Sequence, residues 1–397
     1  MSKIAVGRFP ARTAEEARGM VEKTLKFERE PLSGTWRNRL MLVMGNPGGG
    51  SMAEMFVQQE LGQRLVMLHP AWNVRTAFDA SGSKYFVPPT RLREVTTQWL
   101  DDGELFSIYM GHSRAGGMWS TTDFMSREDW VGLKIPTGGG VFFTCGCFAC
   151  QVEGSDGEGF GLAAMRNPAG PVAVIGASGE SYGALGQLAA GGLLTCLGKE
   201  PFPSRLREYW MAVQAGLAQG QIEESVFKLY DQFDGSGGKV PLAVQRLEHL
   251  EMWTLLGDPA LRLPVVPMDI SLEMPHTVRP GNRISVKGKA PRRLNGARVR
   301  VTMERPLNSA PQGMEKLPEN RPENKEQRER IALENNRRAN DLVLGTVEAK
   351  VARGEFSCEL ETPSMMPWSN VVLRAWAFTE ADGAMGVQAL HVERTAE

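Results

Sequence analysis

The spacing of apolar residues changes near residue 265, and this change constrains the fold more than any other feature of the sequence. Before it, short apolar runs such as Leu40–Met44 and Val172–Ile175 alternate with segments whose apolar residues recur every three or four positions. Short buried strands that alternate with helices are typical of a mainly parallel sheet with helices on both faces. After it, apolar and polar residues alternate one by one, as in Arg283–Lys287. That period is typical of antiparallel strands with one buried face.

The chain has 397 residues, which is enough for two domains with sizeable cores. We expect an α/β domain over residues 1–266, in which Leu65–Leu68 forms a strand. We expect a β-sandwich domain of Ig-like size over residues 267–397. Within it, residues 306–341 are rich in Glu, Asn, Arg and Pro. This insert has too few apolar residues to pack, apart from a short charged helix, so we predict a mobile loop.

Charge and composition exclude several classes of function. A net charge of −1 provides no basic field for nucleic acid or for an anionic membrane. No apolar run is long enough to span a bilayer, and the first ten residues lack the apolar core of a signal peptide. They read instead as a strand within a domain, so we expect a piece of a longer precursor. Five cysteines, three of them within six residues, are not typical of a disulfide framework.

Two buried strands of the first domain end at reactive side chains. Leu105–Met110 is followed closely by His112, and Val141–Thr144 is followed by a cysteine cluster that includes Cys147. In an open α/β sheet, ligands and chemistry gather just beyond the carboxyl ends of the strands. The sequence therefore predicts that His112 and Cys147 meet at this edge.

A thiol and an imidazole that meet in this way are the two parts of a thiol nucleophile site. The imidazole of His112 can lower the pKa of the thiol and later protonate the leaving amine. The backbone N–H groups of Ser113 and Cys147 are candidates for the oxyanion hole, and Gly146 allows a tight path of the backbone. Cys145 competes with Cys147 for the nucleophile role. The plainer alternative is that His112 and Cys147 are core residues, because buried cysteines are common.

The cysteine cluster has a second chemical interpretation. Cys145, Cys147 and Cys150 together with His112 would supply four zinc ligands. Structural zinc sites are usually built from paired Cys-x-x-Cys units, and this sequence has one such unit. We therefore expect no metal.

A rival nucleophile is Ser181 in the stretch Gly179–Gly183, which matches G-x-S-x-G and follows a predicted strand. This is the context of the nucleophile in α/β-hydrolases. Asp231 or Asp234 with His249 would complete its triad. Against this, several residues separate Ser181 from the strand, where the motif requires a sharp turn.

Five other residues are weaker candidates. His69 follows the predicted strand at 65–68, but a loop role is commoner for such a residue. Trp119 and Tyr182 are candidate walls of a substrate pocket, although aromatic residues are more often part of a core. We interpret Glu54 as a helix-capping residue and Asp79 as part of a solvated turn.

Six blocks of the sequence, in order over residues 3–265, resemble the gingipain family of caspase-like cysteine peptidases. They are Ile4–Pro10, Tyr109–Ser113 with Trp119, Val141–Cys147, Phe160–Met165, Pro171–Ser178 and Trp253–Leu261. The resemblance implies a caspase-like, mainly parallel sheet flanked by helices, followed by an Ig-like domain. It also suggests an extracellular or cell-surface location.

Carried onto this sequence, the resemblance implies His112 as general acid and base and Cys147 as nucleophile. The N–H groups of Ser113 and Cys147 would then form the oxyanion hole. Ser113 stands where the family has Gly. No acidic residue can be placed at the base of the pocket for the P1 side chain, so a preference for Arg or Lys does not transfer.

The sequence thus predicts a cysteine endopeptidase that hydrolyses peptide bonds through a Cys-His dyad and a thioester. It needs no cofactor, and its partners are protein or peptide substrates. Two alternatives stay open. One is a serine hydrolase that uses Ser181, and the other is a non-catalytic surface or adhesion module with a decayed site. The sequence does not indicate the oligomeric state.

Overall fold

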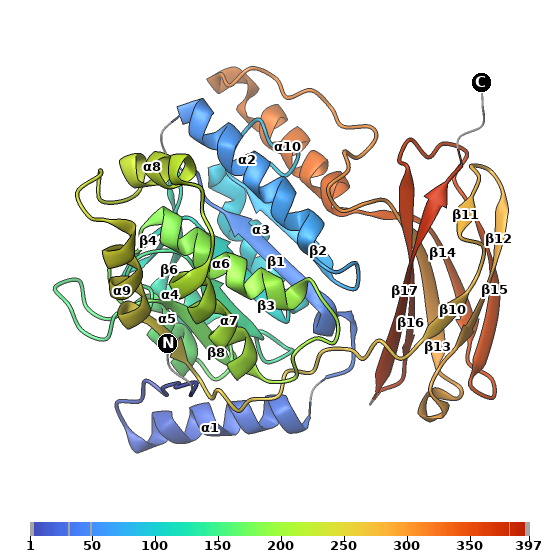
Figure 1. Cartoon of the computed structure of the whole chain (residues 1–397), viewed down its shortest axis with the longest axis horizontal. Coiled ribbons are helices and arrows are strands. Elements are labelled where there is room, and N and C mark those ends of the chain that lie inside the picture. The colour runs from blue at the N-terminus through green and yellow to red at the C-terminus, as the bar shows by residue number, and fades with distance from the viewer. Residues whose placement is uncertain (1–3, 31, 48–49, 381, 394–397) are drawn as a thin grey trace.

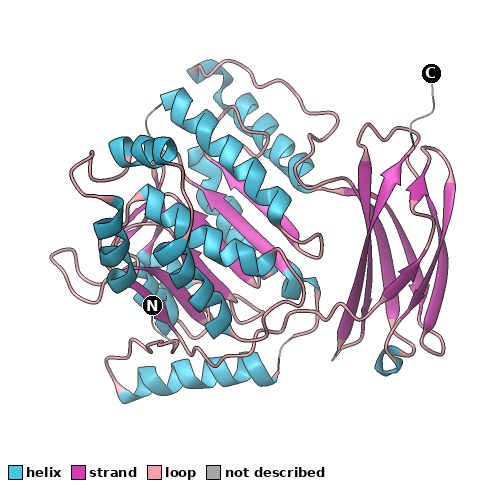
Figure 2. Ribbon diagram, viewed as in Figure 1, coloured by secondary structure: helices cyan, strands magenta, loops and turns pink. Residues whose placement is uncertain are grey.

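The structure, a computed structural model, describes residues 4–30, 32–47, 50–380 and 382–393. Its first part is a sheet between two layers of helices, and its second part consists of packed β-strands at the other end of the molecule (Figure 1). The colours of Figure 2 show the same division into a mixed part and an all-β part.

The first part is built on a six-stranded sheet with the order β2-β1-β3-β7-β8-β9. The neighbours β2 to β8 are parallel, and β9 runs antiparallel to β8. The strands are β1 (Arg39–Met44), β2 (Asn73–Phe78), β3 (Phe106–Met110), β7 (Val141–Thr144), β8 (Ala173–Ala177) and β9 (Trp253–Leu256). This confirms the predicted α/β class with a mainly parallel sheet.

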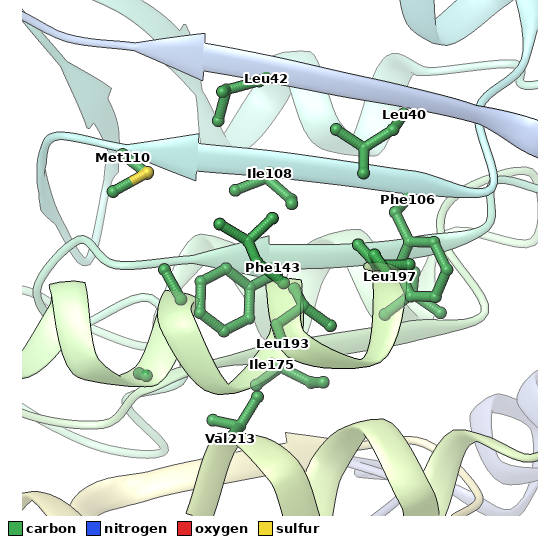
Figure 3. Close-up of a cluster of buried hydrophobic side chains, with 14 of the residues drawn as sticks. Leu40, Leu42, Phe106, Ile108, Met110, Phe143, Ile175, Leu193, Leu197 and Val213 are labelled. Carbon is green, nitrogen blue, oxygen red and sulfur yellow. The ribbon is translucent and has the colours of Figure 1, made fainter. Parts of the chain in front are cut away.

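Helices cover both faces of this sheet, so its central strands are apolar throughout. Alternate residues of β1 show the division: Leu40 and Leu42 belong to one core cluster, whereas Met41 and Val43 belong to the other. Figure 3 shows part of the first cluster, in which strand side chains such as Ile108 cluster with Leu193 and Val213 of the covering helices. This face is covered by α2 (Gly50–Met67), α6 (Gly183–Leu197) and α7 (Leu206–Gln219), and the other by α1 (Ala14–Arg29), α3 (Pro89–Asp102), α4 (Arg127–Gly132) and α5 (Phe160–Arg166).

Further short elements surround the carboxyl edge of the sheet. The strands β4 (His112–Arg114), β5 (Gly117–Trp119) and β6 (Asp123–Ser126) form a small antiparallel sheet directly after β3. Beyond α7 follow α8 (Glu224–Phe233) and α9 (Leu242–Met252). At the opposite, amino edge, the 3-10 helix η1 (Thr35–Asn38) directly precedes β1.

The predicted strand at Leu65–Leu68 is wrong, because these residues belong to the end of α2 and the residues just after it. Leu65 and Leu68 are buried, but Val66 and Met67 are 62% and 56% exposed. That is the spacing of a helix with one buried face, which a four-residue apolar run cannot distinguish from a strand. The strand begins later, at Asn73.

The second part contains two sheets that enclose a core of their own. One has the order β10-β12-β15, and the other has the order β11-β17-β16-β13-β14. The elements are β10 (Ser271–Glu273), β11 (Thr277–Val278), β12 (Arg283–Lys289), η2 (Arg292–Leu294), β13 (Arg298–Glu304), η3 (Pro322–Asn324), α10 (Lys325–Asn340), β14 (Val343–Lys350), β15 (Glu355–Glu361), β16 (Asn370–Phe378) and β17 (Gly383–Val392). The alternating pattern at Arg283–Lys287 forms β12, in which burial alternates from one residue to the next.

The expectation that the insert at 306–341 does not pack is wrong. It contains the 16-residue helix α10, which lies against the first part of the chain (Figure 1). The side-chain amides of α10 form hydrogen bonds with the backbone of β2, the edge strand of the main sheet, where a further strand would otherwise pair. Asn336 Nδ2 donates to the carbonyls of Thr76 (3.0 Å) and Tyr85 (2.8 Å), and the Thr76 N–H donates to Asn340 Oδ1 (2.6 Å). Polar side chains thus dock this helix, which a search for apolar residues does not detect.

A second contact joins the two parts near residue 266. The buried side chains of Ala71, Val266, Trp376 and Met385 form one cluster. Beside it, the buried Arg374 pairs with Glu304 at 2.9 Å. A buried pair of this kind requires both partners, because a lone buried charge is costly.

None of the helices within the described ranges is long and apolar enough to cross a bilayer.

Candidate active site

A cavity of about 60 Å³ lies at the carboxyl edge of the main sheet. Its walls come from the segments that follow β1, β3, β7 and β8, together with α8. The side chains of His112, Cys147 and Asp234 all line it. The structure therefore brings the predicted imidazole and thiol into one cavity. The full lining is Met44, Gly45, Pro47, Val57, Met110, Gly111, His112, Cys145, Cys147, Ser181, Gly183, Gln187, Tyr230, Phe233 and Asp234.

His112 is held by the hairpin of β4 and β5. Its ring stacks on Trp119, with 4.8 Å between the ring centroids and 19° between the planes. The hydroxyl of the buried Tyr109 lies within hydrogen-bond distance of both strands of the hairpin, 2.8 Å from the carbonyl oxygen of His112 and 2.7 Å from that of Trp119. A side chain at Gly111 would approach this hydroxyl to 2.6 Å. The glycine therefore lets Tyr109 fix the hairpin that carries the imidazole.

Cys147 begins the turn that follows β7. Its sulfur accepts a hydrogen bond from the Ser181 N–H (3.3 Å) and lies 3.5 Å from the Ser181 carbonyl oxygen. Burial raises the pKa of the Cys147 thiol to about 11. The hydrogen bond from the Ser181 N–H lowers this pKa, whereas the negative charges of Asp234 and Glu180 raise it. The resting thiol is therefore protonated at neutral pH, and a thiolate requires a proton acceptor at the site.

Ser113 links the two strand ends. Its hydroxyl donates to the Cys147 carbonyl at 2.7 Å. A side chain at Gly146 would collide with this hydroxyl, so Gly146 leaves the room that Ser113 occupies. The next residue after Cys147, Phe148, has a left-handed backbone with φ of 58°. Such conformations are uncommon for a bulky residue and are often found near functional sites.

Asp234 is the residue of this site that the sequence analysis did not assign to the thiol. It follows α8, and its carbonyl accepts a hydrogen bond from the Gly183 N–H at 2.8 Å. A side chain at Gly183 would collide with the Asp234 carboxyl group, which places this group against the loop after β8. Burial raises the pKa of Asp234 to about 6, and a positive charge on His112 opposes that rise. The carboxylate can therefore stabilise an imidazolium.

Comparison with known proteins decides the family. The model of peptidase family C25 matches residues 1–264. The chain belongs to this family. It is the gingipain family of the sequence resemblance and consists of cysteine endopeptidases that act on proteins or peptides, so the predicted family is confirmed.

Solved structures give more distant likenesses. The Arg-specific cysteine proteinase gingipain R is 15% identical, over 98% of this chain and 74% of that chain, with a TM-score of 0.48. A structure described as a protease is 13% identical, over 96% and 73% of the two chains, also with a TM-score of 0.48. Latent PorU from Porphyromonas gingivalis is 16% identical, over 49% and 17%, with a TM-score of 0.23. No curated protein matches the sequence.

The other two cysteines of the cluster in this C25 peptidase point elsewhere. The Cys145 thiol donates to the Gly186 carbonyl of α6 at 3.3 Å, and burial raises its pKa to about 12. Cys150 is 1% exposed, and burial raises its pKa to about 12 as well. Within the described ranges, no three His, Cys, Asp or Glu side chains are placed to hold a metal ion. The hypothetical zinc ligands are therefore not assembled.

The triad considered for Ser181 is not assembled either. His249 Nε2 accepts a hydrogen bond from the Tyr182 N–H (2.9 Å), and Nδ1 lies 2.8 Å from the Gln245 carbonyl. The Ser181 hydroxyl is buried and has no hydrogen-bond partner among the described residues. Asp231 accepts hydrogen bonds from a neighbouring loop and from Gln245 instead. The alternative of a serine hydrolase is therefore not favoured, because both ring nitrogens of His249 are engaged with backbone groups.

The five weaker candidates also have defined places. Trp119 is 38% exposed beside His112, and the Tyr182 ring packs against His249 with 5.3 Å between centroids. His69 precedes β2, at the opposite edge of the sheet from the cavity, and pairs with Glu200 at 3.2 Å.

The interpretation of Asp79 as part of a solvated turn is wrong. It is 3% exposed and accepts a hydrogen bond from the Ser120 hydroxyl at 2.6 Å. Because the strand was predicted too early in the chain, the sequence analysis did not place Asp79 at a strand end. Glu54 accepts a hydrogen bond from Asn46 Nδ2 at 3.0 Å, and the side chains of its expected capping partners at the start of α2 lie outside the described part of the structure.

Proposed function

We propose that this chain is a cysteine endopeptidase with Cys147 as the nucleophile and His112 as the general acid and base. The observation that carries the proposal is that both side chains line one cavity at the carboxyl edge of the sheet in a member of peptidase family C25. Cys145 lines the same cavity, but its thiol is directed to α6. Cys147 is therefore the thiol available to a bound amide.

The reaction has two halves. His112 removes the proton of the Cys147 thiol as the sulfur attacks the scissile carbonyl carbon, and the N–H groups of Ser113 and Cys147 bind the resulting oxyanion. The carbon–nitrogen bond then breaks, and the imidazolium of His112 gives its proton to the leaving amine. A thioester stays on Cys147. Water, deprotonated by His112, attacks the thioester and releases the acid and the free thiol.

Asp234 acts on this cycle through charge. A carboxylate close to the imidazole favours the imidazolium that forms when the thiol loses its proton. The same carboxylate opposes the thiolate, because it raises the pKa of Cys147. We therefore assign Asp234 as a positioning residue. It favours transfer of the thiol proton to His112 during the attack on the substrate, and it disfavours a thiolate in the resting enzyme.

The surroundings of the cavity suit a polypeptide substrate. Trp119 is partly exposed next to His112 and offers an aromatic surface to a bound chain. Tyr182 precedes α6 in the loop that contacts the thiol, and we assign it to the opposite wall. Polypeptides are bound in such clefts by a few polar groups and larger apolar surfaces.

We also assign residues 1–266 to a caspase-like catalytic domain and residues 267–397 to an Ig-like domain. The two sheets and the separate core of the second part support this division. A location outside the cell or at its surface follows from the gingipain resemblance.

Cleavage of a peptide library by the wild-type chain and by the Cys147→Ala variant tests the proposal. Cleavage that is abolished in the variant and blocked by iodoacetamide supports it. Cleavage that resists iodoacetamide and is blocked by a fluorophosphonate would instead support a serine hydrolase. A non-catalytic module would show no cleavage, and no cysteine would react with peptidyl acyloxymethyl ketones.

A further inference from the structure

A second and larger cavity, of about 400 Å³, lies between the catalytic part and the insert of the second part. One wall is the loop after β1 and the residues after β2, and the other is the segment that begins α10. Its volume is within the range of ligand-binding pockets. We call this cavity the α10 groove. It is lined by Asn46, Glu54, Asp79, Ser81, Phe86, Pro88, Pro89, Thr90, Thr121, Asn320, Lys325, Arg328 and Glu329.

The α10 groove neighbours the active-site cavity along one edge of the sheet. The loop after β1 contributes to both, since Gly45 and Pro47 line the active-site cavity and Asn46 lines the α10 groove. In the strand order β2-β1-β3-β7, three steps separate the end of β7, with Cys147, from the end of β2. At about 4.8 Å a step, that is roughly 14 Å, or about four residues of extended chain.

The outer wall of the groove is fixed in place. Asn336 and Asn340 hold α10 on β2, and at the start of the helix the Thr90 hydroxyl donates to Glu329 Oε1 at 2.9 Å. The guanidinium of Arg328 lies over the ring of Phe86 at 5.7 Å. A wall that is ordered before a ligand arrives costs less conformational entropy on binding.

Lys325 differs from the other charged residues of the groove. Asp79, Glu54 and Glu329 already accept hydrogen bonds from neighbouring side chains. The Arg328 guanidinium donates to the Pro318 carbonyl. The Lys325 side chain is exposed, and in the described part of the chain it has no hydrogen bond or ion pair. Its ammonium group is therefore available to an anionic group of a ligand.

We propose that the α10 groove binds the substrate's own chain about four to five residues from the scissile bond, where Lys325 selects an acidic side chain. This inference rests on the proposed function, since it assigns a substrate class to that site. It also gives the insert a role, because the second part of the chain completes the binding surface of the first. Contacts remote from the reacting bond can contribute binding energy that is used in catalysis.

Binding to the Cys147→Ala chain tests the proposal without turnover. The probes are fluorescent 14-residue peptides, centred on a sequence cleaved by the wild type or, failing that, on a common polyalanine core. They carry Asp or Lys at the fourth and fifth residues from the centre of the peptide, on either its N-terminal or its C-terminal side. We expect the Asp peptide of one side to bind about three- to fivefold more tightly than its Lys counterpart, as for a partly exposed ion pair. The preference should fall in 1 M NaCl, where such pairs are screened.

Lys325→Glu in the same background should reverse this preference, so that the Lys peptide binds more tightly. Arg330→Glu is the matched control, because it makes the same charge change at an exposed residue of α10 that does not line the groove. An unchanged preference in Lys325→Glu, an equal change in Arg330→Glu, or no preference in the parent would each overturn the proposal. Absence of cleavage by the wild type would instead overturn the proposed function, so the two failures are distinguishable.

Discussion

The loops after β7 and β8 each carry a candidate nucleophile, and they touch one another through the Ser181 N–H and the Cys147 sulfur. They differ in their histidines. His112 has its ring stacked on Trp119 beside the cavity, whereas both nitrogens of His249 are occupied by backbone groups. A nucleophile is only as reactive as the base that is free to take its proton. The comparison therefore favours the β7 loop for chemistry and gives the β8 loop a supporting role.

Replacement of the two nucleophiles should give the largest contrast. Cys147→Ala should lower kcat/KM by at least about a thousandfold, because the proposed mechanism forms the thioester on this sulfur. Ser181→Ala should lower it by less than about fivefold, since the hydroxyl has no partner among the described residues. Peptide hydrolysis measured with both variants checks this. A large loss in Ser181→Ala would move the chemistry to the β8 loop.

The two histidines should separate activity from stability. His112→Ala should reduce kcat by about a hundredfold or more, because general acid–base catalysis is lost. His249→Ala should lower the free energy of unfolding by about 1–3 kcal/mol, since the Tyr182 N–H loses its acceptor in a buried place. Denaturant titration together with kinetics on the folded fraction checks both. Burial lowers the pKa of His249 to about 4, so the neutral ring that accepts this bond is present at neutral pH.

The glycines of the two loops offer a matched pair. Gly146→Ala should reduce activity by about tenfold, because the new methyl group meets the Ser113 hydroxyl and displaces the backbone of Cys147. Gly179→Ala places its methyl group near the flexible Met252 side chain, at 3.2 Å, and should have little effect. Ser113→Gly combined with Gly146→Ala should recover part of the activity. If activity does not recover, a collision between the new methyl group and the Ser113 hydroxyl is not the cause of the loss.

The smallest expected effect concerns pH. Alkylation of Cys147 by iodoacetamide should keep rising above pH 9, because burial raises the pKa of the thiol to about 11. Asp234→Asn removes a negative charge, so it should lower that pKa and speed alkylation at pH 8 by roughly two- to tenfold. Below pH 6 the wild-type carboxyl group is protonated, and the two rates should converge. A slower reaction of the variant at pH 8 would contradict this electrostatic role.

The parts of the fold that the sequence predicted are those with local signals. Uninterrupted apolar runs predicted β3 and β7, and with them the convergence of His112 and Cys147 at one edge. The run at Leu65–Leu68 was too short to separate helix from strand, and this error displaced Asp79 from its true place at a strand end. Short runs are ambiguous because the same residues suit either period.

The remaining features depend on contacts between distant segments. Asp234 enters the site only because the end of α8 packs against Gly183, and neither residue carries a local signal for that contact. The docking of α10 depends on Asn336 and Asn340, which a search for apolar residues counts against packing. Hydrogen-bond docking of this kind depends on geometry that spacing alone does not reveal.

Identification of the residue that reacts with a peptidyl acyloxymethyl ketone tests the central claim most directly. After incubation of the intact chain near neutral pH, mass spectrometry locates the modified residue, and the His112→Ala variant is treated in parallel. We expect one adduct, on Cys147, and strongly reduced labelling in the variant. Modification of Cys145 in preference to Cys147, or labelling that does not depend on His112, would contradict the account.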